Sequence, residues 1–175
     1  MTIDYICSLV AKLIKKYGET DPFRLAQAMR LTVLFEAMGK QPDACKGFFL
    51  YQSRVKVIVI NSDLPEAIQR IILAHELGHC VLHKEAARLS AFHDFALYDS
   101  SSQYEYEANL FTAELLLEDE LVFEALNEDN FFFAAARSMN VPAELLDFKF
   151  RILKNKGYKI VDTPILANSN FLKRL

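Results

Sequence analysis

The sequence has few cysteines and no long apolar run. Its three cysteines, Cys7, Cys45 and Cys80, are odd in number and show no CxxC spacing. That pattern argues against a disulfide framework and favours a reducing compartment, so we expect a cytoplasmic protein. The chain lacks the run of about 18 apolar residues that a membrane-spanning helix needs. Its first residues also lack the basic start and apolar stretch of a secretion signal, so we expect neither membrane insertion nor export.

The chain also lacks the positive charge of a nucleic-acid-binding protein. Its net charge is −3 and its pI is near 5.8, so we expect no direct contact with nucleic acid. The short basic run at Lys154–Lys159 is interpreted as a solvated helix end. Hydrophobic residues make up 52% of the chain, which is enough for a buried core and argues against disorder. A length of 175 residues fits one domain, 1–175.

Two kinds of periodicity predict an α+β fold. Apolar spacing and capping residues predict four helices in the first two thirds of the chain: 2–17, Asp21-Pro22 to Arg30, 65–84 and 103–117. The C-terminal part (118–175) is predicted to be helical as well, over 118–127, 130–138 and 142–155. Three β-rich runs predict a small antiparallel sheet: Leu31–Phe35, Phe48–Tyr51 and Val55–Ile60. The last two runs are close enough to form a hairpin. Residues 89–102 are predicted to form an irregular loop that borders the substrate cleft.

The first long helix carries the sequence His75-Glu76-Leu77-Gly78-His79, which is an HExxH motif. Positions i and i+4 lie on one face of a helix, so the two histidines can bind one metal ion, for which zinc is the expected choice. Glu76 points to the side and can reach a metal-bound water as a general base. A purely structural cluster is disfavoured, because buried polar residues rarely gather at ligand spacing. Gly78 predicts a close approach by another element.

A catalytic zinc needs a third protein ligand and an open position for water. The helix at 103–117 has an apolar stripe formed by Tyr104, Ala108, Phe111 and Leu115. Glu107 lies within that stripe and Glu105 on the opposite side, so Glu107 is the predicted ligand. Glu105 and Asn109 are spaced i, i+4. The sequence leaves open whether they support the site or form a solvated pair.

Several neighbouring residues can be interpreted in two ways from the sequence. His83 can support the site or contact substrate, or it can be a packed histidine. Glu114 can lie behind the site, or it can end the buried stripe at the surface. Cys80 is interpreted as a buried inert thiol. A donor is also needed to stabilise the oxyanion, and the candidates are Tyr104, Tyr106 and His83.

Two segments resemble the signatures of the ImmA/IrrE metallo-endopeptidases, whose patterns are AHELGHxxLH and ExEANxFAxxLL. Ala74–His83 reads AHELGHCVLH, and Glu105–Leu117 reads EYEANLFTAELLL, with Thr112 where the family usually has alanine. The resemblance implies a zincin-like core with a small sheet, the HExxH helix and the glutamate-bearing helix. It also implies that His75, His79 and Glu107 hold Zn²⁺ and that Glu76 is catalytic.

The same resemblance implies a substrate, namely a helix-turn-helix repressor of a phage or mobile element that is cleaved at a specific site. Two alternatives remain open: a metal-containing regulatory protein that sequesters its partner without cleavage, and a general peptidase of small peptides. An intact Glu76 favours an enzyme, because binding alone does not need this carboxylate. The C-terminal helices lack a basic face, so we expect them to be mainly structural, with a protein-contacting edge.

Overall fold

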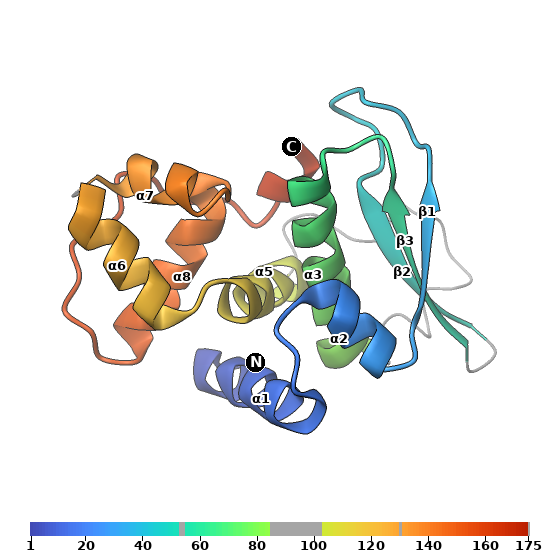
Figure 1. Cartoon of the computed structure of the whole chain (residues 1–175), viewed down its shortest axis with the longest axis horizontal. Helices are drawn as coiled ribbons and strands as arrows, with labels where there is room; N and C mark the ends of the chain where they lie inside the picture. Colours follow the sequence, from blue (N-terminus) through green and yellow to red (C-terminus); the bar gives the residue numbers. More distant parts are fainter. Residues whose placement is uncertain (53–54, 85–102, 130, 175) are drawn as a thin grey trace.

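The computed structural model describes residues 1–52, 55–84, 103–129 and 131–174. The predicted loop at 89–102 lies outside the described residues. Figure 1 shows a three-stranded sheet on one side of the helix α3 (Glu66–Leu82), with the helix α5 (Gln103–Leu116) and the C-terminal helices on the other side. The predicted α+β class, with a small sheet beside the HExxH helix and a glutamate-bearing helix, is confirmed.

The first helix ends and the second begins at the residues that the sequence indicates, but the second helix ends at Ala28, before its expected end near Arg30. The helix α1 (Ile3–Tyr17) ends at Gly18, which adopts the left-handed conformation with φ 70°. The helix α2 (Pro22–Ala28) begins after Asp21, whose side chain accepts hydrogen bonds from the backbone N–H groups of Phe23 and Arg24. The helix α1 packs against α5 and the helix α2 packs against α3, the two helices that carry the motif residues.

The sheet consists of β1 (Thr32–Glu36), β2 (Gly47–Gln52) and β3 (Val55–Asn61), in the order β1-β3-β2. The predicted hairpin is present, because β2 and β3 pair antiparallel. The prediction of an entirely antiparallel sheet is wrong, since β1 pairs parallel with β3. Alternation of apolar residues identifies strands but not which edge of a hairpin a third strand joins. The long connection at 37–46 lets β1 join the free edge of β3, so the sheet is mixed.

The helices α3 and α5 approach each other closely at Gly78. A Cβ atom added to Gly78 would lie 3.2 Å from Ala108 Cα and 3.3 Å from a ring carbon of Phe111. The close approach predicted from this glycine is therefore confirmed, and the element that approaches is the helix carrying the candidate glutamates. The missing side chain at Gly78 lets carboxylates on α5 reach histidines on α3.

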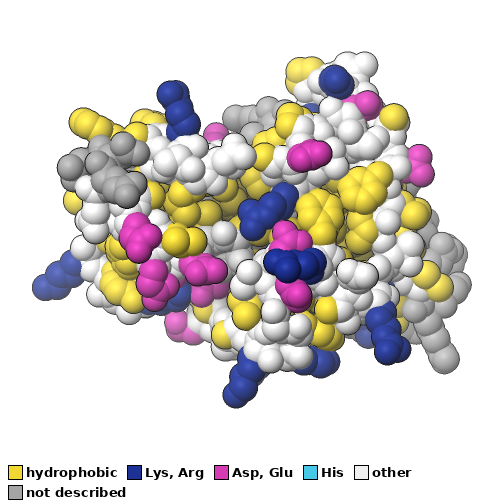
Figure 2. Space-filling view, in the orientation of Figure 1, with side chains coloured by type: hydrophobic (Ala, Val, Ile, Leu, Met, Phe, Trp, Pro, Cys, Tyr) yellow, Lys and Arg dark blue, Asp and Glu magenta, His cyan; other side chains and the backbone are white. Residues whose placement is uncertain are grey.

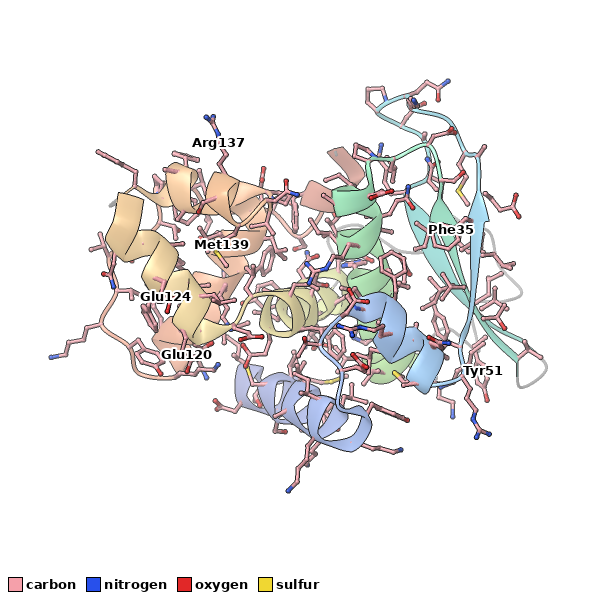
Figure 3. The ribbon with its side chains drawn as sticks, in the orientation of Figure 1. Phe35, Tyr51, Glu120, Glu124, Arg137 and Met139 are labelled. Atoms are coloured by element: carbon pink, nitrogen blue, oxygen red, sulfur yellow. The ribbon has the colours of Figure 1, made fainter. Side chains whose placement is uncertain are left out.

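The C-terminal part consists of α6 (Asp119–Asp129), α7 (Phe132–Ser138), α8 (Ala143–Asn155) and a short 3-10 helix, η1 (Phe171–Arg174), which was not predicted. Buried side chains of α8 such as Phe148 and Ile152 belong to the same apolar cluster as Leu73 and Leu77 of α3. Figure 3 places Phe35 and Tyr51 on the sheet and places Glu120, Glu124, Arg137 and Met139 in the C-terminal helices at the other end of the molecule.

Charged side chains of both signs share the surface. On the face shown in Figure 2, Lys and Arg side chains lie among Asp and Glu side chains and apolar areas, in keeping with the small net charge. Among the described residues, no helix combines the length and the apolar character needed to cross a bilayer. All three cysteines are free thiols, as expected.

A buried ion-pair cluster joins α8 to α5 and to the start of α6. The Lys149 side chain is only 1% exposed, and its Nζ lies 2.6 Å from Glu114 Oε2 and 2.6 Å from Asp119 Oδ1. Lys156 Nζ lies 2.8 Å from the other oxygen of each acid. Burial raises the pKa of Asp119, but hydrogen bonds from the two lysines outweigh that effect and hold the pKa below its ordinary value. Glu114 therefore anchors the C-terminal helices instead of lying behind the metal centre.

We expect Lys149→Met to lower the free energy of unfolding by about 3 kcal/mol at neutral pH, because it leaves two partly buried carboxylates with one lysine. The pair with Asp119 stabilises the fold fully above the unfolded pKa of about 3.9, and this contribution is lost as the pH falls through the lower folded pKa. The difference from wild type should therefore shrink below about pH 4. Urea unfolding at neutral and acidic pH measures both effects.

Lys154→Met is the matched control on the same helix. Lys154 pairs with Asp162, whose side chain is 96% exposed, so water and salt screen this pair and its loss should change the free energy of unfolding far less than the loss of Lys149. Equal losses of stability in the two variants would contradict a structural role for the buried cluster.

Candidate metal centre

Three donor side chains converge where α3 and α5 meet. His75 and His79, both buried, present their Nε2 atoms 3.0 Å apart. From α5, Glu105 places Oε2 3.2 Å from His75 Nε2 and Oε1 3.4 Å from His79 Nε2. The three donor atoms lie within 4.8 Å of one another, and Glu105 itself is only 7% exposed.

This donor set fits zinc. Two nitrogen ligands at about 2.1 Å in a tetrahedral site lie about 3.4 Å apart, which is close to the separations within this cluster. Two imidazoles and one carboxylate also form a common ligand set of catalytic zinc sites, in which the fourth position is kept for water. The spacing and the chemistry of the three side chains both match a single tetrahedral metal ion.

The structure brings a different carboxylate to the two HExxH histidines than the sequence predicts. The expectation that Glu107 faces the two HExxH histidines and that Glu105 faces away is wrong. Glu107 Oε2 instead lies 2.9 Å from His83 Nε2, and Glu107 Oε1 accepts hydrogen bonds from Gln103 and from the N-terminal ammonium group of Met1. The prediction assumed that α5 buries one face only, whereas α5 packs against α1, α3 and α8 and is buried almost all round.

The ionisation of the cluster follows from burial and from the charge on Glu105. Burial raises the pKa of Glu105, but its hydrogen bond with His75, together with the neighbouring His79, outweighs that effect and holds the pKa far below its ordinary value. Burial lowers the pKa of His79 to about 4, which keeps this imidazole neutral. Burial also lowers the pKa of His75, but its hydrogen bond with Glu105 more than compensates, so the pKa is raised. The cluster therefore offers an ionised carboxylate beside a neutral imidazole.

Glu76 lies beside the cluster and is not one of its three donors. Its side chain is buried, at 8% exposure, and burial raises its pKa to about 7, against smaller lowering effects from His75 and from a hydrogen bond with the Phe49 backbone. Phe49 belongs to β2, so the sheet edge and the motif helix meet at this carboxyl group. A carboxyl group of this kind can exchange a proton with a water bound between the three donors.

The other residues that the sequence places near the site differ in what they contact. His83 is buried, and its Nδ1 atom lies 3.0 Å from His79 Nδ1, on the side of the His79 ring away from the cluster. The Tyr104 ring packs on His83, with centroids 4.7 Å apart, so Tyr104 remains near the site. Tyr106 packs instead against Phe148 of α8 and the Arg151 guanidinium, which places it outside the candidate site.

Asn109 supports the cluster from behind, and the reading of Glu105 and Asn109 as a solvated pair is wrong. Asn109 is fully buried, and its side chain beside His75 makes a small contribution to raising the His75 pKa. Asn109 Nδ2 donates to the backbone carbonyl of Ser169, at 2.7 Å. Sequence reasoning missed this contact, because no local pattern links the C-terminal tail to α5. Cys80 is buried with a raised pKa caused mainly by burial, which agrees with an inert thiol.

The fold and the cluster define a metallopeptidase of the HExxH type with a glutamate on a second helix. The family model described as the IrrE N-terminal-like peptidase domain matches residues 26–151. Two relatives match over most of their length. The chain is 37% identical to the uncharacterized immunity region protein 2 of Bacillus phage phi105, over 82% of this chain and 88% of that protein. It is 30% identical to the metallopeptidase ImmA of Bacillus subtilis strain 168, over 90% of this chain and 91% of that protein. The chain therefore belongs to the ImmA/IrrE family of metallopeptidases.

Proposed function

We propose that this protein is a zinc-dependent endopeptidase in which His75, His79 and Glu105 hold the metal and Glu76 is the general base. The observation that carries the proposal is the convergence of two imidazole nitrogens and one carboxylate from two helices, within 4.8 Å and shielded from solvent. A structural cluster does not need donors at metal-ligand spacing with a further buried carboxyl group beside them.

Different residues of the chain have different roles in the proposed hydrolysis. A bound zinc supplies Lewis-acid activation of a water molecule and of the scissile carbonyl. Glu76 accepts the proton of the attacking water and later passes it to the leaving amine. Glu105 contributes the negative charge of the ligand set, and the buried Asn109 lies beside His75. Tyr104 is the better placed of the two tyrosine candidates for stabilising the oxyanion, because it packs on His83 near the site whereas Tyr106 packs against Phe148 of α8.

The proposed substrate is a helix-turn-helix repressor of a phage or mobile element, cleaved at a specific site in the cytoplasm. The support is the family, together with a relative named as an immunity region protein of a phage. We further propose that residues 1–175 form one domain, because α8 and α1 share one apolar cluster with the motif helix. In this arrangement the C-terminal helices cover the core and leave an edge for the protein substrate.

Cleavage of the candidate repressor tests the proposal. The purified protein, loaded with zinc, is incubated with the regulator encoded beside its own gene, and fragments are identified by mass spectrometry. We expect one cleavage site, complete loss of cleavage after treatment with a strong chelator, and recovery on addition of zinc. Uncleaved regulator bound in a stable complex would instead support the alternative of a metal-containing protein that sequesters its partner. Rapid cleavage of unrelated short peptides would support a general peptidase.

A further inference from the structure

A second pair of buried polar side chains lies directly behind the candidate metal ligands. His83 at the end of α3 contacts His79, with 3.0 Å between their Nδ1 atoms, and its Nε2 lies 2.9 Å from Glu107 Oε2. His83 is 3% exposed and Glu107 2% exposed. We propose that Glu107 and His83 form a relay of hydrogen bonds that fixes His79 in the one tautomer able to bind the metal through Nε2.

The direction of each hydrogen bond in the relay follows from the carboxylate of Glu107, with which the relay begins. An ionised carboxylate only accepts, so His83 Nε2 must carry the proton that it shares with Glu107. A neutral His83 then has a bare Nδ1, which accepts a hydrogen bond from His79 Nδ1–H. His79 is left with an unprotonated Nε2, and this is the atom that lies 3.0 Å from His75 Nε2 and 3.4 Å from Glu105 Oε1. One carboxylate thereby determines the tautomers of two histidines in series.

The surroundings of the relay keep Glu107 an acceptor and keep His83 in place. Gln103 Nε2 donates to Glu107 Oε1 at 2.7 Å, so the oxygen that does not meet His83 is also satisfied. The Tyr104 ring packs against the His83 ring and limits its rotation. The relay also explains why Glu107 is buried without being a metal ligand, since a buried carboxylate needs hydrogen-bonding partners.

The inference rests on the proposed zinc site but concerns different atoms. A histidine ligand that donates its other ring N–H to a fixed acceptor is held in orientation, and loss of such a partner weakens metal binding about 10–100-fold. The usual acceptor is a carboxylate or a carbonyl group. Here a second histidine is inserted between the ligand and the carboxylate, so His83 and Glu107 are positioning residues and touch neither metal nor substrate.

The tautomers can be read directly in the unmodified protein. The chain has four histidines, so their ring ¹⁵N signals can be assigned by long-range ¹H–¹⁵N spectroscopy at a single neutral pH. We expect His83 as the Nε2–H tautomer and His79 as the Nδ1–H tautomer, both before and after zinc is added. A protonated Nδ1 on His83 in the folded protein would overturn the relay.

Two pairs of variants measure what the relay contributes. His83→Leu removes both hydrogen bonds, whereas His83→Gln keeps one acceptor and one donor on a planar group; Glu107→Leu and Glu107→Gln form the corresponding pair. We expect each leucine variant to bind zinc about 10–100-fold more weakly in competition with a chromophoric chelator, and each glutamine variant to recover most of the loss. The thermal unfolding of each metal-free variant is recorded alongside, so that a loss of affinity is compared at equal folded fraction.

The outcomes separate the relay from the zinc proposal. Wild-type protein that binds zinc, with leucine variants of unchanged affinity, would overturn the relay and leave the zinc site intact. Wild-type protein without zinc affinity would overturn the proposed function, while the tautomers of the metal-free protein would still decide the relay. Equal losses of affinity in the leucine and glutamine variants would show that hydrogen bonding at these positions is not what positions His79, and would also overturn the relay.

Discussion

Glu105→Ala is expected to abolish stoichiometric zinc binding, whereas Glu107→Ala still binds zinc with reduced affinity. Catalytic zinc sites use three protein ligands, and Glu105 is the carboxylate that lies 3.2 Å and 3.4 Å from the two HExxH histidines. Removing it leaves two imidazoles, so the affinity should fall more than the roughly 10–100-fold that the loss of an outer partner produces. Metal content after dialysis, measured by atomic emission, gives the stoichiometry of each purified variant.

The two substitutions are each other's control. They delete the same carboxylate, two residues apart on one buried helix, so any general cost of truncating a buried glutamate is shared. Circular dichroism of the metal-free proteins checks that both remain helical. Retention of stoichiometric zinc by Glu105→Ala, with its loss in Glu107→Ala, would restore the ligand set first expected from the sequence and would contradict the geometry of the cluster.

The histidine pair could be predicted from the sequence because its geometry is local. Residues i and i+4 face the same way on any helix, so His75 and His79 were certain to lie together once α3 was recognised. The predicted helix boundaries were close for the same reason: caps such as Asp21 and Gly18 act within one turn. The placement of Glu76 beside the two histidines likewise follows from its position within the motif.

Which carboxylate joins the two histidines could not be predicted in this way, because it depends on which face of α5 meets α3. An apolar stripe identifies the core-facing side of a helix that is exposed on the other side. The helix α5 has no such side, and polar residues such as Asn109 and Thr112 are as buried as Phe111. One usable signal was Gly78, whose closest neighbour is Ala108. The side of α5 that carries Ala108 and Glu105 is the one that approaches α3.

Contacts between distant segments were also beyond local patterns. The parallel pairing of β1 with β3 depends on the path of the connection at 37–46, and the hydrogen bond from Asn109 to Ser169 depends on how the tail returns to α5. The His83–Glu107 contact belongs to the same group. Each arises when secondary-structure elements pack, and packing is decided by the whole core and not by a run of neighbouring residues.

Glu76→Gln should keep zinc and lose cleavage, and this result separates an enzyme from a binding protein. Glutamine has nearly the same shape as glutamate but cannot accept the proton of the attacking water. General-base catalysis contributes about 10²–10⁴-fold, so we expect the cleavage rate to fall by at least about 100-fold. Zinc content should stay at the wild-type level, because Glu76 is not among the three converging donors. Binding of the uncleaved repressor should also persist and can be measured by titration calorimetry.

Glu66→Gln is the matched control, because Glu66 lies on the same helix and is exposed at its start. It makes the same chemical change far from the cluster and should leave both zinc content and cleavage unaltered. Cleavage by Glu76→Gln protein at the wild-type rate would remove Glu76 as the general base. If the wild-type protein and Glu76→Gln both bind the repressor and neither cuts it, the protein acts by sequestering its partner. In that case the buried carboxyl group at position 76 would have to be explained by stability, and metal-free unfolding of the two proteins would measure that contribution directly.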